Sequence, residues 1–490
     1  MANLVDTARV EKWAILTLLL VVVIRLVSMG YPDIVDTTEG RYASISKYML
    51  ETGDYVTPHM PLRQEGWVPY MGKPPLYFWL GSASLKTFGM NAWAARLPSF
   101  LSALLLGVIV YYFGLLAFGK RTALISVLAF QSMLVIFVTS SVVMLDMTVA
   151  AFMGASLLGF YCIITNKGGT WSQYLFFIGL ALGFLTKGPL ALVLCGGTIF
   201  LWSLIQRDFK WLFKVSWFKG ALILGAIILP WFYLAERAQP GFLKYFFMNE
   251  NFLRFVTRNY QDKYGSGHVY PRGSALVLMI ALSIPWSIIL LTTLRRYLQV
   301  WKGIWQERNP ALMLCFAWAL FPALFFSAAR QITPLYILPC LGGLALCVGY
   351  FWTRLDFNPL KAAKLSLILG CVYGLGTVIS GPFVSEARST RGMVEMIYEK
   401  SRSHPTVVGV PIGNPFSAYF YSNKGQIELV AIEQSRLLGS PINDVILKKR
   451  DLKGLSTEIT NYFKSAGEWG KYIWLKRETL PKQEFSSAHK

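Results

Sequence analysis

The chain has 490 residues, of which 54% are hydrophobic and 15% are charged, and its formal net charge is +21. A soluble domain carries about a quarter charged residues, so this composition excludes an ordinary soluble enzyme and indicates lipid as the solvent. The charge is spread between hydrophobic segments without a recognisable nucleic-acid-binding fold. It therefore indicates basic cytoplasmic loops and contact with membrane lipids, and no nucleic acid partner.

Apolar runs of about 20 residues recur along the chain, and each can cross about 30 Å of hydrocarbon as a helix. Because lipid cannot pair backbone amides, these runs are predicted to be helical. The first run, Trp13–Met29, lacks the small-residue cleavage site of a signal peptide and is predicted to be retained. The fold class is an α-helical polytopic membrane protein with about 11–13 transmembrane helices. The spans are placed at residues 13–30, 93–117, 122–140, 146–165, 172–186, 189–206, 220–236, 274–293, 309–328, 333–353 and 364–384.

Every second loop between the predicted spans lies on the same side of the membrane, and the short loops on one side are strongly basic. This bias fixes the predicted orientation. Together these short loops hold 13 basic residues against Asp208, Glu307 and Asp356, as expected on the cytoplasmic side. These loops are 118–121, 166–171, 207–219, 294–308 and 354–363. The long loops 31–92 and 237–273 then lie on the outer side together with the C-terminal tail.

Two kinds of structure are predicted outside the spans. In the first loop, Glu39–Leu50 repeats apolar residues at helical spacing, and Leu76–Phe88 is a second interfacial or re-entrant candidate. The tail has the charge density of a soluble fold and is predicted to be a small α/β domain. Residues 1–384 therefore form a transmembrane domain, and residues 385–490 form the second domain. Its predicted elements are strands Thr406–Val410, Gln426–Val430 and Lys471–Lys476, and helices Thr390–Ser401 and Leu455–Lys464.

Metal and disulfide chemistry receive no support from the sequence. All six cysteines lie within apolar runs, and none has a metal-ligand spacing, so we expect no disulfide and no cysteine-based metal site. Four histidines are too few and too scattered to indicate a cluster. No metal and no cofactor are therefore predicted.

The first loop carries the residues with the strongest chemical pattern. Asp36 and Glu39 are followed by Arg41 and Tyr42, and Lys73 stands before two prolines. A carboxylate can orient an acceptor or take its proton, while cations neutralise a leaving phosphate. A capped interfacial helix beginning at Thr38 explains the same residues without chemistry.

Polar residues at the ends of later spans lie on the same side of the membrane. Asp146 lies at the start of a span, while Lys187 and Arg330 each lie at the break between two apolar runs. Each has an ordinary alternative, either a carboxylate at a helix N-terminus or a cation that snorkels to the head groups. Together with Lys73 they predict a site where cations at head-group height hold the phosphate of a lipid whose tail lies between apolar helices.

At these residues the chain resembles the membrane-embedded GT-C glycosyltransferases, in particular the branch of lipid A aminoarabinose transferases and protein O-mannosyltransferases. The matching segments occur in the expected order over about residues 31–340. They are Glu39-x-Arg41-Tyr42-Ala43, Gly53-Asp54-x-Val56-x-Pro58, Lys73-Pro74-Pro75-Leu76, Ala95-Arg96-Leu97-Pro98, Leu145-Asp146 and Thr186-Lys187-Gly188-Pro189, with weaker matches at Asn251-Phe252-x-Arg254-Phe255 and Tyr336-x-Leu338-Pro339.

The resemblance implies a GT-C fold, a polyprenyl-phosphate-linked sugar donor, inversion at the anomeric carbon, and an active site on the periplasmic face of the cell inner membrane. Two positions depart from the family pattern: Thr38 stands where the family has an aspartate, and Gly72 where it has a glutamate. The predicted catalytic carboxylates are Glu39 and Asp146, which match the family pattern, and Asp36, which is inferred because it is an aspartate two residues before Thr38. The predicted donor-phosphate ligands are Lys73, Lys187, Arg41, Tyr42, Arg254, Arg330 and Tyr336, and His268 is a further candidate.

Several functions remain open at this point. The preferred acceptor is lipid A or a related envelope glycolipid, and a protein acceptor is the alternative within the family. A transporter or flippase of lipid-linked sugars would place ionisable groups near the bilayer midplane, whereas here they cluster at one face. An inactive binding protein is supported only by the departures at Thr38 and Gly72.

Overall fold

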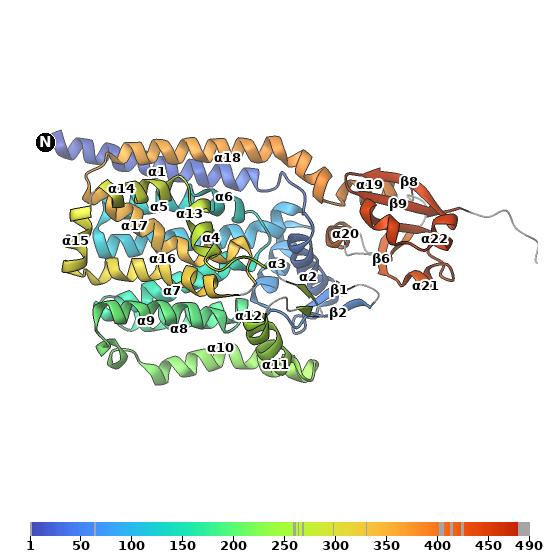
Figure 1. Ribbon diagram of the computed structural model, residues 1–490, viewed down its shortest axis with the longest axis horizontal. Helices are drawn as coiled ribbons and strands as arrows, with labels where there is room; N and C mark the ends of the chain where they lie inside the picture. The colour runs from blue at the N-terminus through green and yellow to red at the C-terminus, as the bar shows by residue number, and fades with distance from the viewer. Residues whose placement is uncertain are drawn as a thin grey trace, which may run out of the picture. The chain divides into compact units, whose positions relative to one another are not determined.

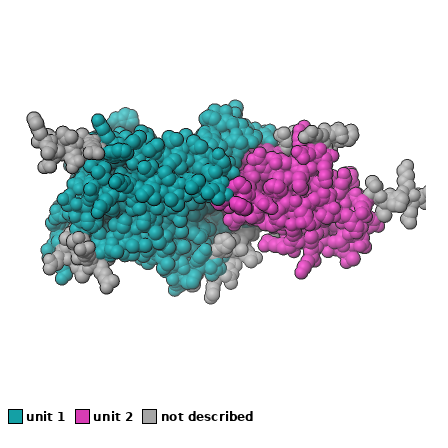
Figure 2. All heavy atoms as spheres, turned by 90° about the horizontal axis from the view of Figure 1, so that it is seen from above, with its two compact units in different colours: residues 1–31, 49–58, 69–379 teal, residues 32–48, 59–68, 380–490 magenta. Residues whose placement is uncertain are grey.

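The structure, a computed structural model, divides the chain into two compact units, which Figure 2 colours separately. The helical unit comprises Met1–Tyr31, Met49–Pro58 and Pro69–Ile379. The C-terminal unit comprises Pro32–Tyr48, His59–Val68 and Ser380–Lys490, so two segments of the first loop belong to it. The residues described are 2–62, 65–257, 261–262, 264–266, 269–296, 298–329, 331–400, 406–411, 415–422 and 426–478.

Long apolar helices confirm a multi-pass membrane protein (Figure 1). Within the described residues, six helices are long and apolar enough to cross a membrane. They are α4 (Ala92–Phe118), α7 (Leu145–Ile164), α10 (Trp217–Ala238), α16 (Pro310–Ala328), the continuous pair η3 (Pro334–Cys340) and α17 (Leu341–Arg354), and α18 (Pro359–Arg388). A seventh span results if α13 (Ser274–Leu282) and α14 (Trp286–Arg296), which meet at a 106° bend, are counted as one.

The remaining predicted spans are also helical, but they are short, interrupted or less apolar. They correspond to α1 (Ala2–Ser28), α5 (Lys120–Gln131) with α6 (Leu134–Thr139), α8 (Gly169–Lys187) and α9 (Leu190–Gln206). The predicted span 122–140 breaks at Ser132, whose hydroxyl accepts a 3.0 Å hydrogen bond from the Trp286 indole. The predicted number of spans is therefore larger than the six or seven that satisfy length and hydropathy in the described part of the chain.

The core of the helical unit lies among α4, α5, α7, α16 and α17, around the fully buried Trp318. Small residues allow these helices to approach closely, as is typical of packing in membranes. Gly159 of α7 is an example, because a Cβ there would lie 2.6 Å from the backbone nitrogen of Phe176 in α8. The two helices run in opposite directions through a short turn, so the start of α7 lies beside the end of α8.

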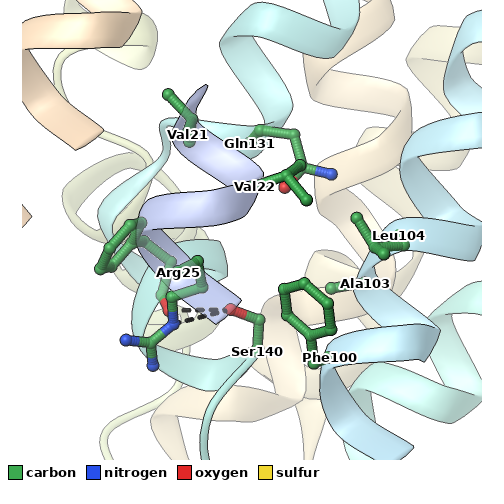
Figure 3. Close-up of a pocket in the computed structure, with 9 residues that line it drawn as sticks. Val21, Val22, Arg25, Phe100, Ala103, Leu104, Gln131 and Ser140 are labelled. Atoms are coloured by element: carbon green, nitrogen blue, oxygen red, sulfur yellow. Dashed lines mark hydrogen bonds between the residues drawn. The ribbon is translucent and has the colours of Figure 1, made fainter. Parts of the chain in front are cut away.

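A buried arginine ties the first helix to the segment that follows α6 (Figure 3). Arg25 lies in the last turn of α1, and its Nε donates to the Ser140 hydroxyl at 3.2 Å. Its guanidinium also lies 4.6 Å from the ring centroid of Phe137. The small pocket beside it is lined mainly by apolar side chains, among them Val22 and Leu104. This arginine therefore holds α1 against the break between α6 and α7.

The first loop contains both predicted helices and one small sheet. The interfacial prediction Glu39–Leu50 corresponds to α2 (Thr38–Thr52), and α3 has the predicted bounds Leu76–Phe88. The two-stranded sheet of β1 (His59–Leu62) and β2 (Gly66–Pro69) was not predicted.

The second loop is built around an uncommon element. A π-helix, η2 (Tyr245–Leu253), is flanked by the single turns α11 (Phe242–Lys244) and α12 (Arg254–Val256). The short strands β3 (Gln261–Asp262) and β4 (Gly265–Ser266) follow and pair antiparallel. π-helices are rare and often occur at functional sites.

The tail folds as the predicted α/β domain, around a five-stranded sheet with strand order β6-β5-β7-β9-β8. Strand β5 runs parallel to β6 and β7, whereas β9 runs antiparallel to β7 and β8. The strands are β5 (Thr406–Val410), β6 (Ile427–Ala431), β7 (Asp444–Lys448), β8 (Phe463–Trp469) and β9 (Tyr472–Arg477). The helices include α19 (Arg391–Lys400), α20 (Phe416–Tyr421), α21 (Gln434–Leu437) and α22 (Thr457–Tyr462).

Candidate active site

A buried ion pair joins the ends of two neighbouring helices in the helical unit. Asp146 lies in the first turn of α7, and Lys187 is the last residue of α8. The Lys187 ammonium donates to the Asp146 carboxylate at 2.5 Å, and both side chains are only 9% exposed. The same ammonium lies 4.1 Å from the ring centroid of Tyr336 in η3, a cation–π contact.

Local structure explains why these residue types occur at these positions. A carboxylate stabilises the positive end of a helix dipole, and an ammonium stabilises the negative end. Because α7 and α8 are antiparallel, the two favourable positions face each other. A buried ion pair usually contributes little net stability, since the loss of hydration offsets the attraction. The presence of this buried pair therefore fits a site that needs a fixed cation.

A second charged cluster lies in the same unit and centres on Glu250 of η2. One carboxylate oxygen accepts from the Lys73 ammonium, and the other accepts from Arg254 at 2.7 Å. The Glu250 side chain is 3% exposed, compared with 14% for Lys73 and 27% for Arg254. Burial alone would raise the pKa of Glu250, but the two cations outweigh it and lower the pKa. The cluster carries two positive charges against one negative charge.

Apolar packing places the two clusters at the same end of the helical unit. Phe184 and Leu185, just before Lys187, share a hydrophobic cluster with Phe246 of η2 and with Met71 and Leu76 on either side of Lys73. A Cβ on Gly188 would lie 2.4 Å from the Phe246 ring, so glycine is required there for close approach.

A hydrogen-bonded link reinforces this arrangement from the Asp146 side. The Tyr77 hydroxyl, one residue beyond Leu76, accepts from the backbone nitrogen of Met144 at 2.9 Å and bonds Ser99 at 2.6 Å. The segment after Lys73 is thus tied to the segment that leads into Asp146. Of the predicted site residues, the structure brings together Lys73 and Arg254 in one cluster, through Glu250, and Asp146, Lys187 and Tyr336 in the other.

Glu250 was missed by the sequence analysis, although it is the centre of the second cluster. Its signal was weak: a single acidic residue among aromatic neighbours, four residues before Arg254. On a regular helix such spacing ordinarily indicates a surface ion pair of little consequence. The contact with Lys73, 177 residues away, could not be inferred from local spacing.

Asp36 belongs to the C-terminal unit and is held by neutral donors of the small domain. One carboxylate oxygen accepts from the backbone nitrogen of Ser417 at 2.7 Å, and the other accepts from the Tyr472 hydroxyl. Burial raises the pKa of Asp36, although both hydrogen bonds act in the opposite direction. Gly40 allows this contact, because a Cβ there would lie 2.7 Å from the Ser417 nitrogen. In this arrangement Asp36 anchors the loop, and its catalytic role stays a prediction.

The other predicted residues of the first loop lie on α2. Glu39 is buried and accepts from the backbone nitrogen of Val35 at 3.0 Å, and the Arg41 guanidinium lies 5.1 Å from the Tyr42 ring centroid. Further along α2, the Ser44 hydroxyl donates to the Phe416 carbonyl at 2.8 Å, and Lys47 donates to the Tyr419 carbonyl at 3.0 Å. The small domain thus supports the segment that carries Glu39. Convergence of these residues with those of the helical unit stays a prediction.

Two predicted site residues, His268 and Arg330, lie outside the described residues. The residues that follow them, Val269 and Gln331, form an antiparallel bridge in the helical unit. Among the residues that the structure describes, no three His, Cys, Asp or Glu side chains form a group suited to a metal ion.

Comparison with known proteins identifies the fold. Residues 12–246 match the family model described as dolichyl-phosphate-mannose-protein mannosyltransferase. The crystal structure of ArnT from Cupriavidus metallidurans bound to undecaprenyl phosphate matches with a TM-score of 0.77. The match covers 95% of this chain and 98% of that chain, at 19% sequence identity. The chain has a GT-C fold.

A more distant GT-C structure, the archaeal oligosaccharyltransferase AglB from Archaeoglobus fulgidus, also matches. Its TM-score is 0.53 at 12% identity, over 90% of this chain and 70% of that one.

Sequence relatives support the same resemblance to GT-C enzymes. Two are named undecaprenyl phosphate-alpha-4-amino-4-deoxy-L-arabinose arabinosyl transferase. The protein from Yersinia enterocolitica is 31% identical over 356 residues, which is 70% of this chain and 60% of the relative. The protein from Erwinia tasmaniensis is 31% identical over 382 residues, which is 76% of this chain and 64% of the relative. The chain thus spans 60–64% of the length of these relatives, and the predicted resemblance is confirmed.

Proposed function

We propose that this protein is a glycosyltransferase that moves a sugar from a polyprenyl-phosphate donor to an envelope acceptor. The observation that carries the proposal is the pair of buried charge clusters at one end of the helical unit. Their cations, Lys73, Lys187 and Arg254, suit the phosphate of a lipid whose tail lies between apolar helices. The names of the Yersinia and Erwinia relatives support an undecaprenyl-phosphate-linked aminoarabinose as the donor.

The proposed reaction is a single displacement with inversion. An acceptor oxygen forms a bond to the anomeric carbon while the bond from that carbon to the phosphate oxygen breaks, leaving polyprenyl phosphate. Negative charge grows on the leaving phosphate, so cations fixed beside it stabilise the transition state more than the ground state. Asp146 and Glu250 hold these cations in place before the donor binds, because each already forms an ion pair.

The carboxylates of the first loop serve the acceptor in this proposal. Glu39 orients the acceptor or takes the proton of an acceptor hydroxyl, and Arg41 and Tyr42 stand beside it on α2. An acceptor that is already a phosphate is anionic and needs only positioning. Asp36 contributes by anchoring the loop to the small domain.

We place the protein in the cell inner membrane, with the active site and the small domain on the periplasmic side. The basic loops of one parity support this orientation, because such loops remain cytoplasmic. The preferred acceptor is lipid A or a related glycolipid. A protein acceptor is the alternative, and the match of residues 12–246 to a protein mannosyltransferase model favours it.

The decisive experiment incubates the purified protein in lipid nanodiscs with undecaprenyl-phosphate aminoarabinose and either lipid A or total envelope protein. We expect release of undecaprenyl phosphate together with aminoarabinose-modified lipid A, both measured by mass spectrometry. Modified protein instead of modified lipid A would establish the alternative acceptor. Absence of polyprenyl phosphate release with every acceptor would refute the transferase function.

A further inference from the structure

An apolar cavity of about 300 Å³ lies between α8, α9 and α10, away from both charge clusters. Its volume is at the lower end of the range for sites that bind small molecules. The lining is aromatic and aliphatic, with phenylalanines of α8, Trp211 from the segment between α9 and α10, and Trp217 at the start of α10. Lining residues include Phe177, Gly196, Trp211, Trp217, Ala221 and Leu224.

Exposed lysines are next in sequence to lining residues of the cavity, on the segment between α9 and α10 and in the first turn of α10. Lys210 directly precedes the lining residue Trp211, and Lys219 lies two residues before the lining residue Ala221. Lys214 lies between them, and its ammonium donates to the Ile164 carbonyl at 3.0 Å, which ties the loop to the end of α7. The segment from Lys210 to Lys219 therefore combines several positive charges with residues that line an apolar cavity.

The same segment and the first turn of α10 expose large aromatic side chains, as a segment at a lipid interface does. Phe213 is 93% exposed and Phe218 is 79% exposed. Aromatic residues and lysines together are typical of the head-group region of a bilayer. These side chains support a place for this segment in the head-group region, next to the residues that line the cavity.

The cavity is separate from the candidate active site. Phe177 lies ten residues before Lys187 on α8, a separation of about 15 Å along the helix. Phe184 and Leu185, which lie between these two residues on α8, belong to a packed hydrophobic cluster with Trp231 and Phe232, and Leu192 of that cluster also lines the cavity. A lipid in this cavity is thus not the donor whose phosphate the catalytic cations would hold.

We propose that this cavity binds one acyl chain of an anionic glycerophospholipid, whose phosphate is held by Lys210, Lys214 and Lys219. Apolar lining residues match the chain, and the lysines match the charge of the head group. The proposal is independent of the transferase function, because none of these residues belongs to the charge clusters. It assigns a lipid-binding role to a loop that the sequence analysis used only for orientation.

Gly196 offers a way to fill the cavity without disturbing its walls. A Cβ at Gly196 would meet no atom within 4 Å, so Gly196→Phe should place its ring in the cavity. Gly376→Phe is the matched control, since Gly376 is exposed on α18 and equally open. Thermal melting of both variants in detergent checks that the fold is intact.

The test is native mass spectrometry of delipidated full-length protein titrated with phosphatidylglycerol or with phosphatidylcholine of the same chains. We expect the wild type and Gly376→Phe to retain one phosphatidylglycerol, at least tenfold tighter than phosphatidylcholine, and Gly196→Phe to lose it. Lys210→Gln combined with Lys219→Gln should weaken phosphatidylglycerol about tenfold and leave phosphatidylcholine unchanged.

Three results would overturn the proposal. The first is equal retention of phosphatidylglycerol by Gly196→Phe and the wild type. The second is equal affinity of the wild type for the two phospholipids, which would indicate an unselective apolar slot. The third comes from a parallel titration with undecaprenyl phosphate. If this lipid displaces phosphatidylglycerol from the wild type and no longer binds to Gly196→Phe, the cavity is part of the donor site.

Discussion

Two buried carboxylates in different units have opposite environments. Glu250 of the helical unit lies between Lys73 and Arg254, which lower its pKa despite burial. Asp36 of the C-terminal unit accepts hydrogen bonds from neutral donors, Ser417 and Tyr472, and burial raises its pKa. A carboxylate between two cations positions side chains that can also bind a phosphate. A carboxylate that accepts hydrogen bonds from neutral donors fixes a loop. The two environments fit the proposed roles, a phosphate site around Glu250 and a structural anchor at Asp36.

The largest expected effect comes from Lys187→Ala. Loss of a cation that stabilises the leaving phosphate should lower the transfer rate about 10²–10³-fold. The rate of undecaprenyl phosphate release, measured on protein of verified membrane insertion, checks this. Lys86→Ala is the control, because Lys86 is an exposed lysine of the same unit, and it should leave the rate unchanged.

Stability must be separated from chemistry in that experiment. Removing Lys187 leaves Asp146 buried without its cation, which costs about 3–5 kcal/mol. Combining Lys187→Met with Asp146→Leu removes both charges and should restore thermal stability without restoring transfer. Recovery of transfer in the double variant would show that the pair is structural only.

A smaller effect is expected from Glu250→Gln. The amide keeps the size of the side chain but no longer fixes both Lys73 and Arg254, and misplacement by about 1 Å can cost as much as 10²-fold in rate. We expect kcat to fall about tenfold while the KM for the donor stays level or falls, because the cations become available to its phosphate. Steady-state kinetics measure the changes in kcat and in the KM for the donor separately. A raised KM with normal kcat would contradict the role of Glu250 in positioning.

Asp36 provides the sharpest test of the supporting role. In Asp36→Asn the amide oxygen can still accept from the Ser417 nitrogen, so this variant should retain transfer within about fivefold. Asp36→Ala instead leaves the buried Ser417 donor unpaired, which costs about 1–3 kcal/mol. Transfer rates and melting temperatures of both variants check this. A loss of about 10²-fold or more in Asp36→Asn with unchanged melting would make Asp36 catalytic after all.

The smallest expected effect is a pH dependence of stability. Because the pKa of Asp36 is raised in the folded protein, the folded state holds this proton more tightly than the unfolded chain. The contribution of Asp36 to stability therefore falls as pH rises from about 3.9 through the raised value, and Asp36→Asn should remove this slope. The lowered pKa of Glu250 acts oppositely, since its contribution is lost as pH falls. Melting curves of the wild type and Asp36→Asn between acid and neutral pH check the sign, and a parallel slope in both would contradict it.

Periodicity and composition were sufficient for the helices but not for the long-range contacts. Apolar runs predicted α3, α4 and α7 nearly to the residue, because lipid leaves a helix as the only structure that pairs its backbone. Among the strands, Thr406–Val410 was predicted correctly, while β7 and β8 were missed, and the helix predicted at Leu455–Lys464 runs into the start of β8. In the site, Lys187 and Asp146 were predicted because they lie at the ends of apolar spans. Glu250 and the partners of Asp36 depend on contacts between distant segments, which local spacing does not contain.

The central claim is that Lys73, Lys187 and Arg254 form a phosphate site at one end of the helical unit. The most direct measurement compares binding of undecaprenyl phosphate and undecaprenol to the purified protein and to a variant combining Lys73→Ala with Arg254→Ala. We expect the wild type to bind the phosphate at least tenfold tighter than the alcohol, and the variant, which keeps only Lys187, to lose most of this preference. Equal binding of the two lipids by the wild type would contradict the account.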